Sequence, residues 1–427
     1  MSAVAQIAAA RGYVVSGCDQ QTDTPYIDKV KKTGIRVRTG HSATHLKDID
    51  LLAVTPAVFY QNDTHPEVQE AKKKGILIKW QDFLGCYLHQ DNFLISIAGT
   101  HGKSTTTSIA GLLLEAADLD PTVEVGATVT NWHNNVRIGK GKFFISEADE
   151  FHNNFGSYQS DIIILTLLEL DHPEFFGSQE KMLECFQGFI DHRKSQAPVI
   201  VNIDSPLISK LDLPPDFIGY SLNQVENINQ DQNGSSFTYD GFTYRLRIPG
   251  KHNILNSLAV INLAKILKID PKITNQVLEN FTGISRRLEL LGSKGTNFVY
   301  DDYANHPSSF SASISAIKQL YPDHKIIAVI EPHTFSRLRS LLHQLPDAVR
   351  LADKIIVSEI FASREKDPGD FTGRDIVSAM KHPDCVYIPK FEDIVTALKN
   401  SNLQNSAILV MGSGNSYKLS RDILAAI

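Results

Sequence analysis

The sequence predicts an α/β fold in three domains, with mostly parallel sheets covered by helices. Short apolar runs alternate with helical segments over most of the chain, which is the pattern of β-α-β units. The apolar run 93–98 passes through a glycine turn directly into a helix. With 427 residues, 42% of them hydrophobic, the chain has the length of about three ordinary domains. We place the domains at residues 1–91, 92–287 and 288–427.

The first domain is expected to be a small Rossmann-like unit. We predict a helix over residues 2–11 and strands over 13–16 and 51–54. A nucleotide-binding unit of this type opens with a strand and a glycine-rich turn, whereas this sequence opens with the helix. We therefore expect the unit to lack its first strand, through a misassigned start codon or a truncation. Asp19 follows the expected strand 13–16, as a ribose-binding acid or as an ordinary turn residue.

The other two domains repeat the alternation of strands and helices. In the middle domain we expect helices over 105–117 and 253–267, a hairpin over 237–248, and strands over 93–98, 143–146, 162–168 and 199–202. The third domain reads as a second Rossmann-like α/β unit, with strands over 298–300, 325–330, 354–357, 385–388 and 407–410.

Composition narrows the function classes. The net charge is −6, and Lys72–Lys74 is the main basic run, most simply a solvated helix end, so we expect no nucleic-acid partner. The cysteines lack CxxC spacing, which fits a reducing compartment and predicts no zinc site. No stretch is apolar and long enough to span a membrane. These features together favour a cytoplasmic protein.

The segment 99–105 has the features of a phosphate-binding loop. Glycines allow backbone N–H groups to approach phosphate oxygens, and the start of a helix adds partial positive charge. Lys103 is placed to reach the β- and γ-phosphates, and Ser104 to face magnesium. The loop is shorter than GxxxxGK[ST], and the plain alternative is a tight turn with a solvated lysine. The predicted nucleotide contacts are Gly99, Thr100, His101, Gly102, Lys103, Ser104 and Thr105.

Two strand ends in the middle domain carry residues of the metal-binding type. Glu147 opens the acidic run EADE at 147–150, and His172 follows the strand 162–168. Ligands bind beyond the carboxyl ends of parallel strands, so Ser104, Glu147 and His172 are candidate magnesium ligands. The ordinary alternatives are a solvated acidic turn and a structural histidine.

Further polar residues lie at element ends. His252 and Asn256 are placed to meet an adenine, although the neighbouring Asn253 reads more simply as a helix N-cap. Arg286 and Arg287 lie at the second domain boundary, where a cation suits a phosphate or carboxylate. Polar clusters follow two strands of the third domain, at 301–307 and 331–337.

An ordered set of motifs resembles the Mur ligase family over essentially the whole chain. The set comprises GTHGKSTTT at 99–107, EADE at 147–150, LELDHPEFF at 168–176, GKHNILNSLAVI at 250–261, GISRRLE at 283–289, DDYANHP at 301–307, EPHTFSRLR at 331–339 and SREKDPGD at 363–370. The strings EPHTFSR and REKDPG point to the alanine-adding type. Two departures are the absent GIGGIG opening and FHNNF after EADE.

The resemblance implies a cytoplasmic enzyme that uses ATP and Mg²⁺ to join L-alanine to UDP-N-acetylmuramate in peptidoglycan synthesis, as a monomer or homodimer. Lys103, Glu147, His172, His333 and Arg337 are the catalytic residues it implies. It also implies nucleotide contacts from His252, Asn256, Arg286 and Asp301, and substrate contacts from Asp19, Arg287, Tyr303, His306 and Arg337. Two alternatives stay open: a ligase that attaches a preformed peptide, and a nonenzymatic nucleotide-binding remnant.

Overall fold

The computed structural model describes residues 1–21, 24–56, 58–61, 64–363 and 365–427. These residues form two compact units, each discontinuous in sequence. The first unit comprises Met1–Glu169, Gln179–Tyr220 and Ala259–Ile269, and the second comprises Leu170–Ser178, Ser221–Leu258 and Asp270–Ile427. The expected α/β fold class is confirmed, while the boundaries at 91 and 287 remain a prediction. Among the described residues, no helix is apolar and long enough to cross a membrane.

The N-terminal part of the first unit contains two parallel strand pairs. Strand β1 (Ser16–Asp19) pairs with β2 (Arg36–Thr39), and β3 (Leu52–Val54) pairs with β4 (Leu77–Lys79). The expected strand 13–16 is wrong, because Tyr13 and Val14 lie exposed after the helix end and pairing starts only at Ser16. The accompanying helices are α1 (Ser2–Ala10), α2 (Pro25–Lys32), η1 (Ala43–Leu46), α3 (Val58–Gln61), α4 (Pro66–Lys74), α5 (Trp80–Phe83) and η2 (Leu84–Leu88).

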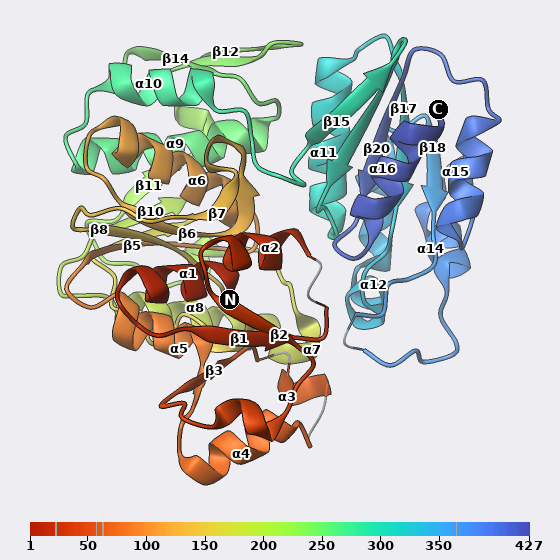
Figure 1. Ribbon diagram of the computed structural model, residues 1–427. Coiled ribbons are helices and arrows are strands. Elements are labelled where there is room, and N and C mark those ends of the chain that lie inside the picture. The colour runs from red at the N-terminus through yellow and green to blue at the C-terminus, as the bar shows by residue number, and fades with distance from the viewer. Residues whose placement is uncertain (22–23, 57, 62–63, 364) are drawn as a thin grey trace. The chain divides into compact units, whose positions relative to one another are not determined.

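A seven-stranded sheet is the core of the first unit, in the order β11-β10-β9-β5-β8-β6-β7 (Figure 1). Its strands are β5 (Phe93–Ala98), β6 (Thr122–Val129), β7 (Asn134–Arg137), β8 (Phe143–Ala148), β9 (Ile162–Leu165), β10 (Val199–Asn202) and β11 (Ile218–Tyr220). Only β7 is antiparallel to its neighbour. The predicted strands β5 and β10 are confirmed residue for residue, whereas β9 ends three residues before the predicted end at 168.

Helices α6 (Lys103–Ala116) and α8 (Gln179–Asp191) accompany this sheet, with short turns η3 (Thr130–Trp132), η4 (Phe151–Asn153) and η5 (Ile208–Lys210). Helix α6 begins two residues before the predicted start at 105. The apolar face of α6 includes Ile109, Leu113 and Leu114, which are fully buried. Burial of this apolar face fixes the start of α6 beyond the carboxyl end of β5, where the glycine loop lies.

The second unit begins its β-structure with a three-stranded antiparallel sheet rather than a simple hairpin. It consists of β12 (Glu226–Asp231), β13 (Gly234–Tyr239) and β14 (Phe242–Leu246). Helix α10 (Pro271–Asn280) packs against β14. Helix α9 (Lys251–Ile266) has residues in both units. Two short helices of the second unit precede this sheet in the sequence, namely α7 (Pro173–Phe176) and η6 (Leu222–Gln224).

A six-stranded sheet of order β15-β16-β20-β17-β18-β19 carries the rest of the second unit. Its strands are β15 (Glu289–Lys294), β16 (Asn297–Asp302), β17 (Lys325–Ile330), β18 (Lys354–Val357), β19 (Cys385–Tyr387) and β20 (Ser406–Met411). All neighbours are parallel except β15 and β16. All five strands predicted for this domain are present, and the antiparallel strand β15 was not foreseen.

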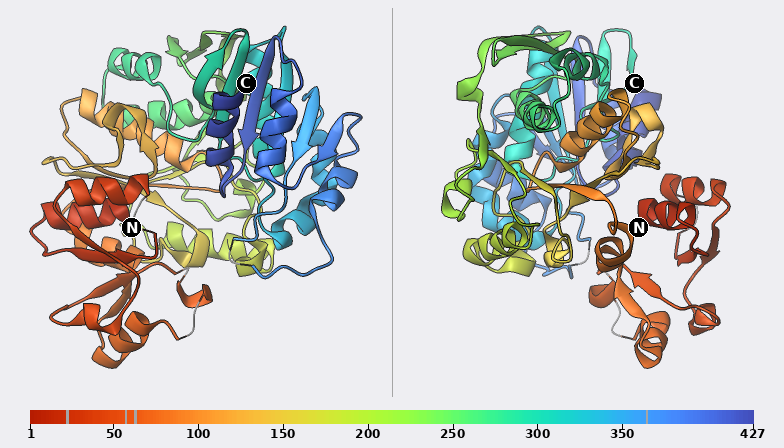
Figure 2. Two further views of the ribbon diagram at one scale, coloured as in Figure 1. Left: turned by 45° about the vertical axis from the view of Figure 1, so that its right-hand side comes forward. Right: turned by 90° about the vertical axis from the view of Figure 1, so that its left-hand side faces the viewer.

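Helices cover both faces of this sheet (Figure 2). Alternate residues of β17 show why: Ile326, Ala328 and Ile330 join one apolar core, and Ile327 and Val329 join the other. Continuous apolar strands of this kind require a helical layer on each side. The layers are formed by α11 (Pro307–Leu320), α12 (Phe335–Leu341), η7 (Leu342–Gln344), α13 (Leu345–Val349), α14 (Gly373–Met380), α15 (Phe391–Lys399) and α16 (Ser416–Ala426).

Candidate active site

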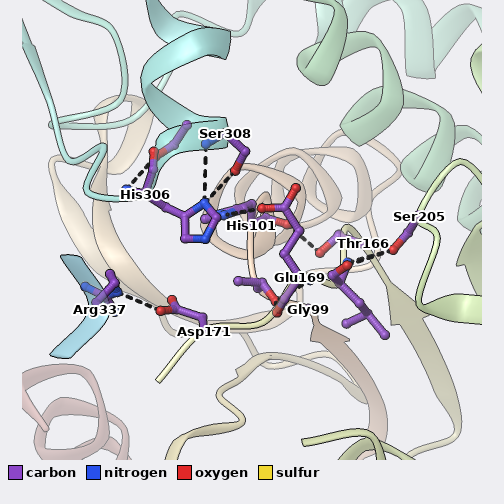
Figure 3. Close-up of polar contacts among 12 residues, drawn as sticks. Gly99, His101, Thr166, Glu169, Asp171, Ser205, His306, Ser308 and Arg337 are labelled. Carbon is purple, nitrogen blue, oxygen red and sulfur yellow. Dashed lines mark hydrogen bonds and ion pairs between the residues drawn. The ribbon is translucent and has the colours of Figure 1, made fainter. Parts of the chain in front are cut away.

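The loop between β5 and α6 requires glycine at its first position. Gly99 has φ of 136°, and a Cβ there would lie 2.2 Å from Oγ1 of Thr166. The hydroxyl of Thr166 donates to the carbonyl of His101 at 2.6 Å and so holds the loop from the next strand (Figure 3). A side chain at position 99 would push this strand end away, because the contact is close and the backbone conformation is left-handed.

The chain after β9 fixes the rest of the loop. The carbonyl of Leu167 accepts from the N–H of Thr100 at 2.7 Å. The hydroxyl of Thr100 donates to the carbonyl of Glu169 at 2.9 Å and accepts from its N–H at 3.0 Å. Nε2 of His101 lies 3.6 Å from the Glu169 carboxylate. Thr100 and His101 thus have structural partners within the first unit, and their contact with a nucleotide remains a prediction.

The loop ends at a helix start suited to anions. Gly102, with φ of 90°, is the N-cap of α6, and within the described chain no side chain caps this end. Lys103, Ser104 and Thr105 form the first turn, so their N–H groups have no partner earlier in the helix. The partial positive charge of the helix favours a phosphate at this position.

Lys103 is paired with a carboxylate that the sequence prediction did not assign. Its Nζ lies 2.7 Å from Oε2 of Glu150 and also donates to the carbonyl of Gly99. Burial alone would lower the pKa of Lys103, but Glu150, Asp149 and Glu147 together raise it above its ordinary value. The lysine therefore stays charged, and its ammonium is held at the loop. Glu150 is the last residue of the acidic run EADE, and this run was the sequence feature that could have identified it as the partner of Lys103.

Ser104 and Glu147 lie together, as a shared metal site requires. The hydroxyl of Ser104 donates to Oε1 of Glu147 at 3.0 Å, and the N–H of Gly126 donates to Oε2 at 2.7 Å. Hydroxyl and carboxylate oxygens are hard ligands of the kind that Mg²⁺ prefers. The pair therefore fits a magnesium ion that is otherwise held by water and phosphate.

A second carboxylate, that of Glu124, lies on the strand next to Glu147. Glu124 on β6 is buried and accepts from the hydroxyl of Ser146 at 3.3 Å. Burial, and then the charge of Glu147, raise the pKa of Glu124 to about 7. The neutral form of this buried side chain avoids a second negative charge beside Glu147. Nothing in the sequence pattern singled out Glu124.

His172, the third predicted metal ligand, belongs to the second unit. It has φ of 52° and precedes the short helix α7, and its N–H donates to Oδ1 of Asp171 at 2.8 Å. Its Nε2 lies 3.8 Å from Oδ2 of the same carboxylate. The left-handed backbone is an unusual conformation for histidine, which indicates that its neighbours fix the position of the side chain. Its role at a metal remains a prediction.

Asp171 also binds Arg337 of α12. Nε of Arg337 donates to Oδ1 of Asp171 at 2.7 Å, and both side chains are at least nine-tenths buried (Figure 3). Nη1 of Arg337 lies 3.1 Å from Nδ1 of His333, whose ring stacks on Phe361. The structure thus brings the predicted residues Arg337 and His333 together. Asp171 was not among the predicted site residues.

Arg286 is held at the end of the six-stranded sheet. Its guanidinium donates to the carbonyl of Gly412 at 2.7 Å and to the hydroxyl of Ser416 at 3.0 Å. The group lies over the rings of Tyr303 and Tyr417, at 5.0 and 5.2 Å from their centres. Such packing fixes an arginine more firmly than an exposed ion pair does.

Asp301 is the acidic partner of Arg286. The ion pair measures 3.5 Å from Nε to Oδ2. Burial raises the pKa of Asp301 to about 6, against the opposing influence of Arg286. The predicted residues Arg286, Asp301 and Tyr303 therefore form one cluster, and Arg287 also lies over Tyr303, at 5.1 Å.

His306 has a structural role as N-cap of α11. Its Nδ1 accepts from the N–H of Ser308 and lies 2.8 Å from the hydroxyl of that serine (Figure 3). Two glutamates bind helix starts in a comparable way. Glu331 accepts from the N–H groups of Gly414, Asn415 and Ser416, and Glu365 accepts from those of Phe335 and Ser336. Both glutamates lie in the motifs quoted above.

The remaining predicted residues are His252 and Asn256 on α9 and Asp19 at the end of β1. Asn253 is not the N-cap, because α9 begins at Lys251; its amide instead donates to the carbonyl of Pro249 at 2.7 Å. His252 lies in the first turn of α9, and Asn256 lies about one turn further along. The amide of Asn256 donates to Oδ1 of Asn253 at 3.1 Å. Oδ1 of the exposed Asp19 accepts from the N–H of Gln21 at 3.0 Å, the geometry of a turn.

Comparison with known protein families accounts for most of the chain. Residues 1–91 match the model described as Mur ligase family, catalytic domain. Residues 97–264 match the Mur ligase middle domain, and residues 286–414 match the Mur ligase, glutamate ligase domain.

Individual relatives match over nearly full length. A UDP-N-acetylmuramate–L-alanine ligase of Caldanaerobacter subterraneus subsp. tengcongensis is 32% identical over 99% of this chain and 95% of its own. The protein of that name from Acetivibrio thermocellus is 34% identical, over 98% and 92%. The crystal structure of the UDP-N-acetylmuramate-alanine ligase of Thermotoga maritima gives a TM-score of 0.82 at 25% identity, covering 100% of this chain and 96% of that one. A murein peptide ligase from Psychrobacter arcticus shares the fold, with a TM-score of 0.71 at 21% identity, covering 100% and 96%.

Proposed function

Since the chain belongs to the Mur ligase family, we propose that it joins L-alanine to UDP-N-acetylmuramate with conversion of ATP to ADP and phosphate, in peptidoglycan synthesis. The main observation behind the proposal is the charged cluster at the start of α6. There Lys103 forms an ion pair with Glu150, and the hydroxyl of Ser104 donates to Glu147. It provides a phosphate cradle in a chain whose alanine-adding relatives match it along nearly its whole length.

The proposed reaction forms an amide through an acyl phosphate. A carboxylate is a poor electrophile, so a lactyl oxygen of the sugar nucleotide first takes the γ-phosphoryl group of ATP and releases ADP. The amino group of L-alanine then attacks the acyl carbon, loses a proton, and expels phosphate. Phosphoryl transfer depends on positioning and on neutralising charge. The ammonium of Lys103 and the N–H groups of α6 supply these effects.

Magnesium suits the oxygen ligands that Ser104 and Glu147 present, with His172 as a proposed third contact. The ion would polarise the phosphoryl oxygens and offset their charge. Glu150 keeps Lys103 charged, while Gly126 orients the Glu147 carboxylate.

The second unit supplies most of the other proposed contacts. Arg286, Asp301, His252 and Asn256 are assigned to the nucleotide. Arg287, Tyr303, His306, His333 and Arg337 are assigned to the sugar nucleotide or L-alanine, as is Asp19 of the first unit. Arg286 is held over the rings of two tyrosines, and Arg337 is held by its ion pair with Asp171. This fixed geometry supports the assignments, because preorganised cations bind anions at small entropic cost. We further propose a cytoplasmic enzyme.

The full chain, ATP, Mg²⁺ and UDP-N-acetylmuramate provide the test. Addition of L-alanine should produce ADP, phosphate and the UDP-sugar carrying alanine, in equal amounts by mass spectrometry. A parallel reaction with a peptide that begins with L-alanine tests the peptide-adding alternative. Preferred use of the peptide would contradict the proposed acceptor. ATP binding without turnover of either acceptor would favour the nonenzymatic alternative.

A further inference from the structure

A second cluster of potential ligands lies in the first unit, apart from the phosphate loop. It consists of Cys18, His41, His45, His65 and Glu67, which we name the Cys-His-Glu cluster. Cys18 lies on β1, His41 follows β2, and His45 lies on η1. His65 is the N-cap of α4, and Glu67 lies in its first turn.

The parallel pairing of β1 and β2 explains how the cluster forms. Cys18 is opposite Arg38, so the chain leaving β2 carries His41 to the strand end occupied by Cys18. The side chain of Glu67 then reaches this strand end from α4. The N–H of Ser42 donates to Oε1 of Glu67 at 3.1 Å and fixes the carboxylate there. Ligands from separate segments leave no CxxC spacing, which is why the sequence predicted no zinc site.

The spacing of these atoms is close to that of metal ligands. Sγ of Cys18 lies 3.1 Å from both carboxylate oxygens of Glu67 and 3.3 Å from Nδ1 of His41. Nδ1 of His41 lies 3.5 Å from Oε2 of Glu67. In a tetrahedral zinc site with bonds of roughly 2.0–2.3 Å, neighbouring ligand atoms are about 3.3–3.6 Å apart. A cation can therefore be held with small side-chain movements.

The two remaining imidazoles extend the set. Nδ1 of His45 lies 2.7 Å from Oε1 of Glu67, and Cys18, His45 and Glu67 have ligand atoms within 4.8 Å of one another, as do His41, His65 and Glu67. Nδ1 of His65 accepts from the N–H of Val68, so this ring would use Nε2 toward a metal. The rings of His41 and His65 lie 4.5 Å apart.

Charge and burial favour a cation at this position. The Glu67 side chain is only 4% exposed, and its ion-pair partners are the imidazoles of His41 and His45. The thiol of Cys18 donates to this buried carboxylate, and a bound metal ion would replace the thiol proton and add positive charge beside Glu67.

We propose that the Cys-His-Glu cluster binds one divalent transition-metal ion of the zinc class, with Cys18 and Glu67 as ligands and the neighbouring imidazoles completing the set. Sulfur and imidazole ligands select zinc-class ions over Mg²⁺. The site would stabilise the N-terminal part of the chain, because it joins β1, the segment after β2, and α4. Two-stranded sheets such as β1–β2 and β3–β4 have little stability alone.

Cobalt provides the test, since Co²⁺ occupies zinc sites and its absorption reports the ligands. The untagged full chain, freed of metal by a chelator, should bind one Co²⁺ with a thiolate-to-cobalt charge-transfer band, and Zn²⁺ should abolish the band. Cys18→Ser should remove the band and weaken Zn²⁺ binding on the order of 10²-fold or more. Cys86→Ser, at an exposed cysteine, and His343→Ala, at an exposed histidine, should change neither.

Two further variants keep the thiol and guard against loss of folding. His41→Asn and His45→Gln should each weaken Zn²⁺ binding about 10-fold or more while circular dichroism stays unchanged. Zinc should also raise the unfolding temperature of the wild-type chain but not that of Cys18→Ser. Absence of a charge-transfer band, or a band that persists in Cys18→Ser, would overturn the proposal and leave a hydrogen-bonded network.

Discussion

Nζ of Lys103 and Oε2 of Glu150 lie 2.7 Å apart at the start of α6. We expect Lys103→Ala to reduce ATP-dependent ligation on the order of 10²-fold or more, because a positioned charge at the transferring phosphoryl group is lost. Turnover should be measured with all three substrates at saturation. Lys140→Ala, at an exposed lysine, is the control. Near-normal turnover of a folded Lys103→Ala chain would contradict the assigned loop.

The Ser104–Glu147 pair leads to a prediction about magnesium. Ser104→Ala and Glu147→Gln should each raise the Mg²⁺ concentration needed for half-maximal rate, and lower the maximal rate, because each removes an oxygen ligand or its charge. The measurement is a Mg²⁺ titration of the ligation rate at fixed ATP. Glu184→Gln, at an exposed glutamate of α8, should leave the titration unchanged. An unchanged titration in both site variants would place the ion elsewhere.

Gly99 and Gly241 offer a matched comparison. Both have positive φ, but a Cβ at Gly99 would meet Thr166 at 2.2 Å, whereas at Gly241 nothing lies within 4 Å. Gly241→Ala should therefore lower the free energy of unfolding by about 1–2 kcal/mol, from backbone strain alone. Gly99→Ala should cost more and also weaken ATP binding, measured by calorimetry. Equal effects of the two substitutions on both measurements would contradict the role of Thr166.

The buried pair of Arg337 and Asp171 should show strong coupling. Removing one partner leaves an unpaired charge and should cost roughly 3–5 kcal/mol, whereas removing both should cost less than the sum. The free energy of unfolding of the second unit is measured by chemical denaturation in the wild-type chain, Arg337→Met, Asp171→Asn and the double variant. These four values form a double-mutant cycle. Additive effects would show that the two side chains do not stabilise each other.

These features differ in how far the sequence predicts them. Strand β5 and the start of α6 follow from local patterns, an apolar run and a glycine turn, and both are present. Glu150, Thr166 and Asp171 were not identified, because their roles depend on contacts across the sheet or between helices. The β1 strand was misplaced by three residues, since apolar Tyr13 and Val14 imitate a buried run. Cys18 and Glu67 are 49 positions apart, so no local spacing reveals their contact.

Asp301 provides a prediction about pH. Its folded pKa of about 6 lies above its ordinary value of 3.8, so between these values the folded state binds more protons than the unfolded state. Stability should therefore fall as pH rises from about 4 to about 6, and the loss is complete above that range. A shift of this size corresponds to about 3 kcal/mol at most, since each pKa unit is worth about 1.4 kcal/mol.

Asp301→Asn has no such charge to bury, so the difference in unfolding temperature between wild type and variant should change across this window. Asp323→Asn, at an exposed position, serves as control. A difference that stays constant from pH 4 to pH 7 would show that Asp301 is ionised throughout and that Arg286 outweighs burial.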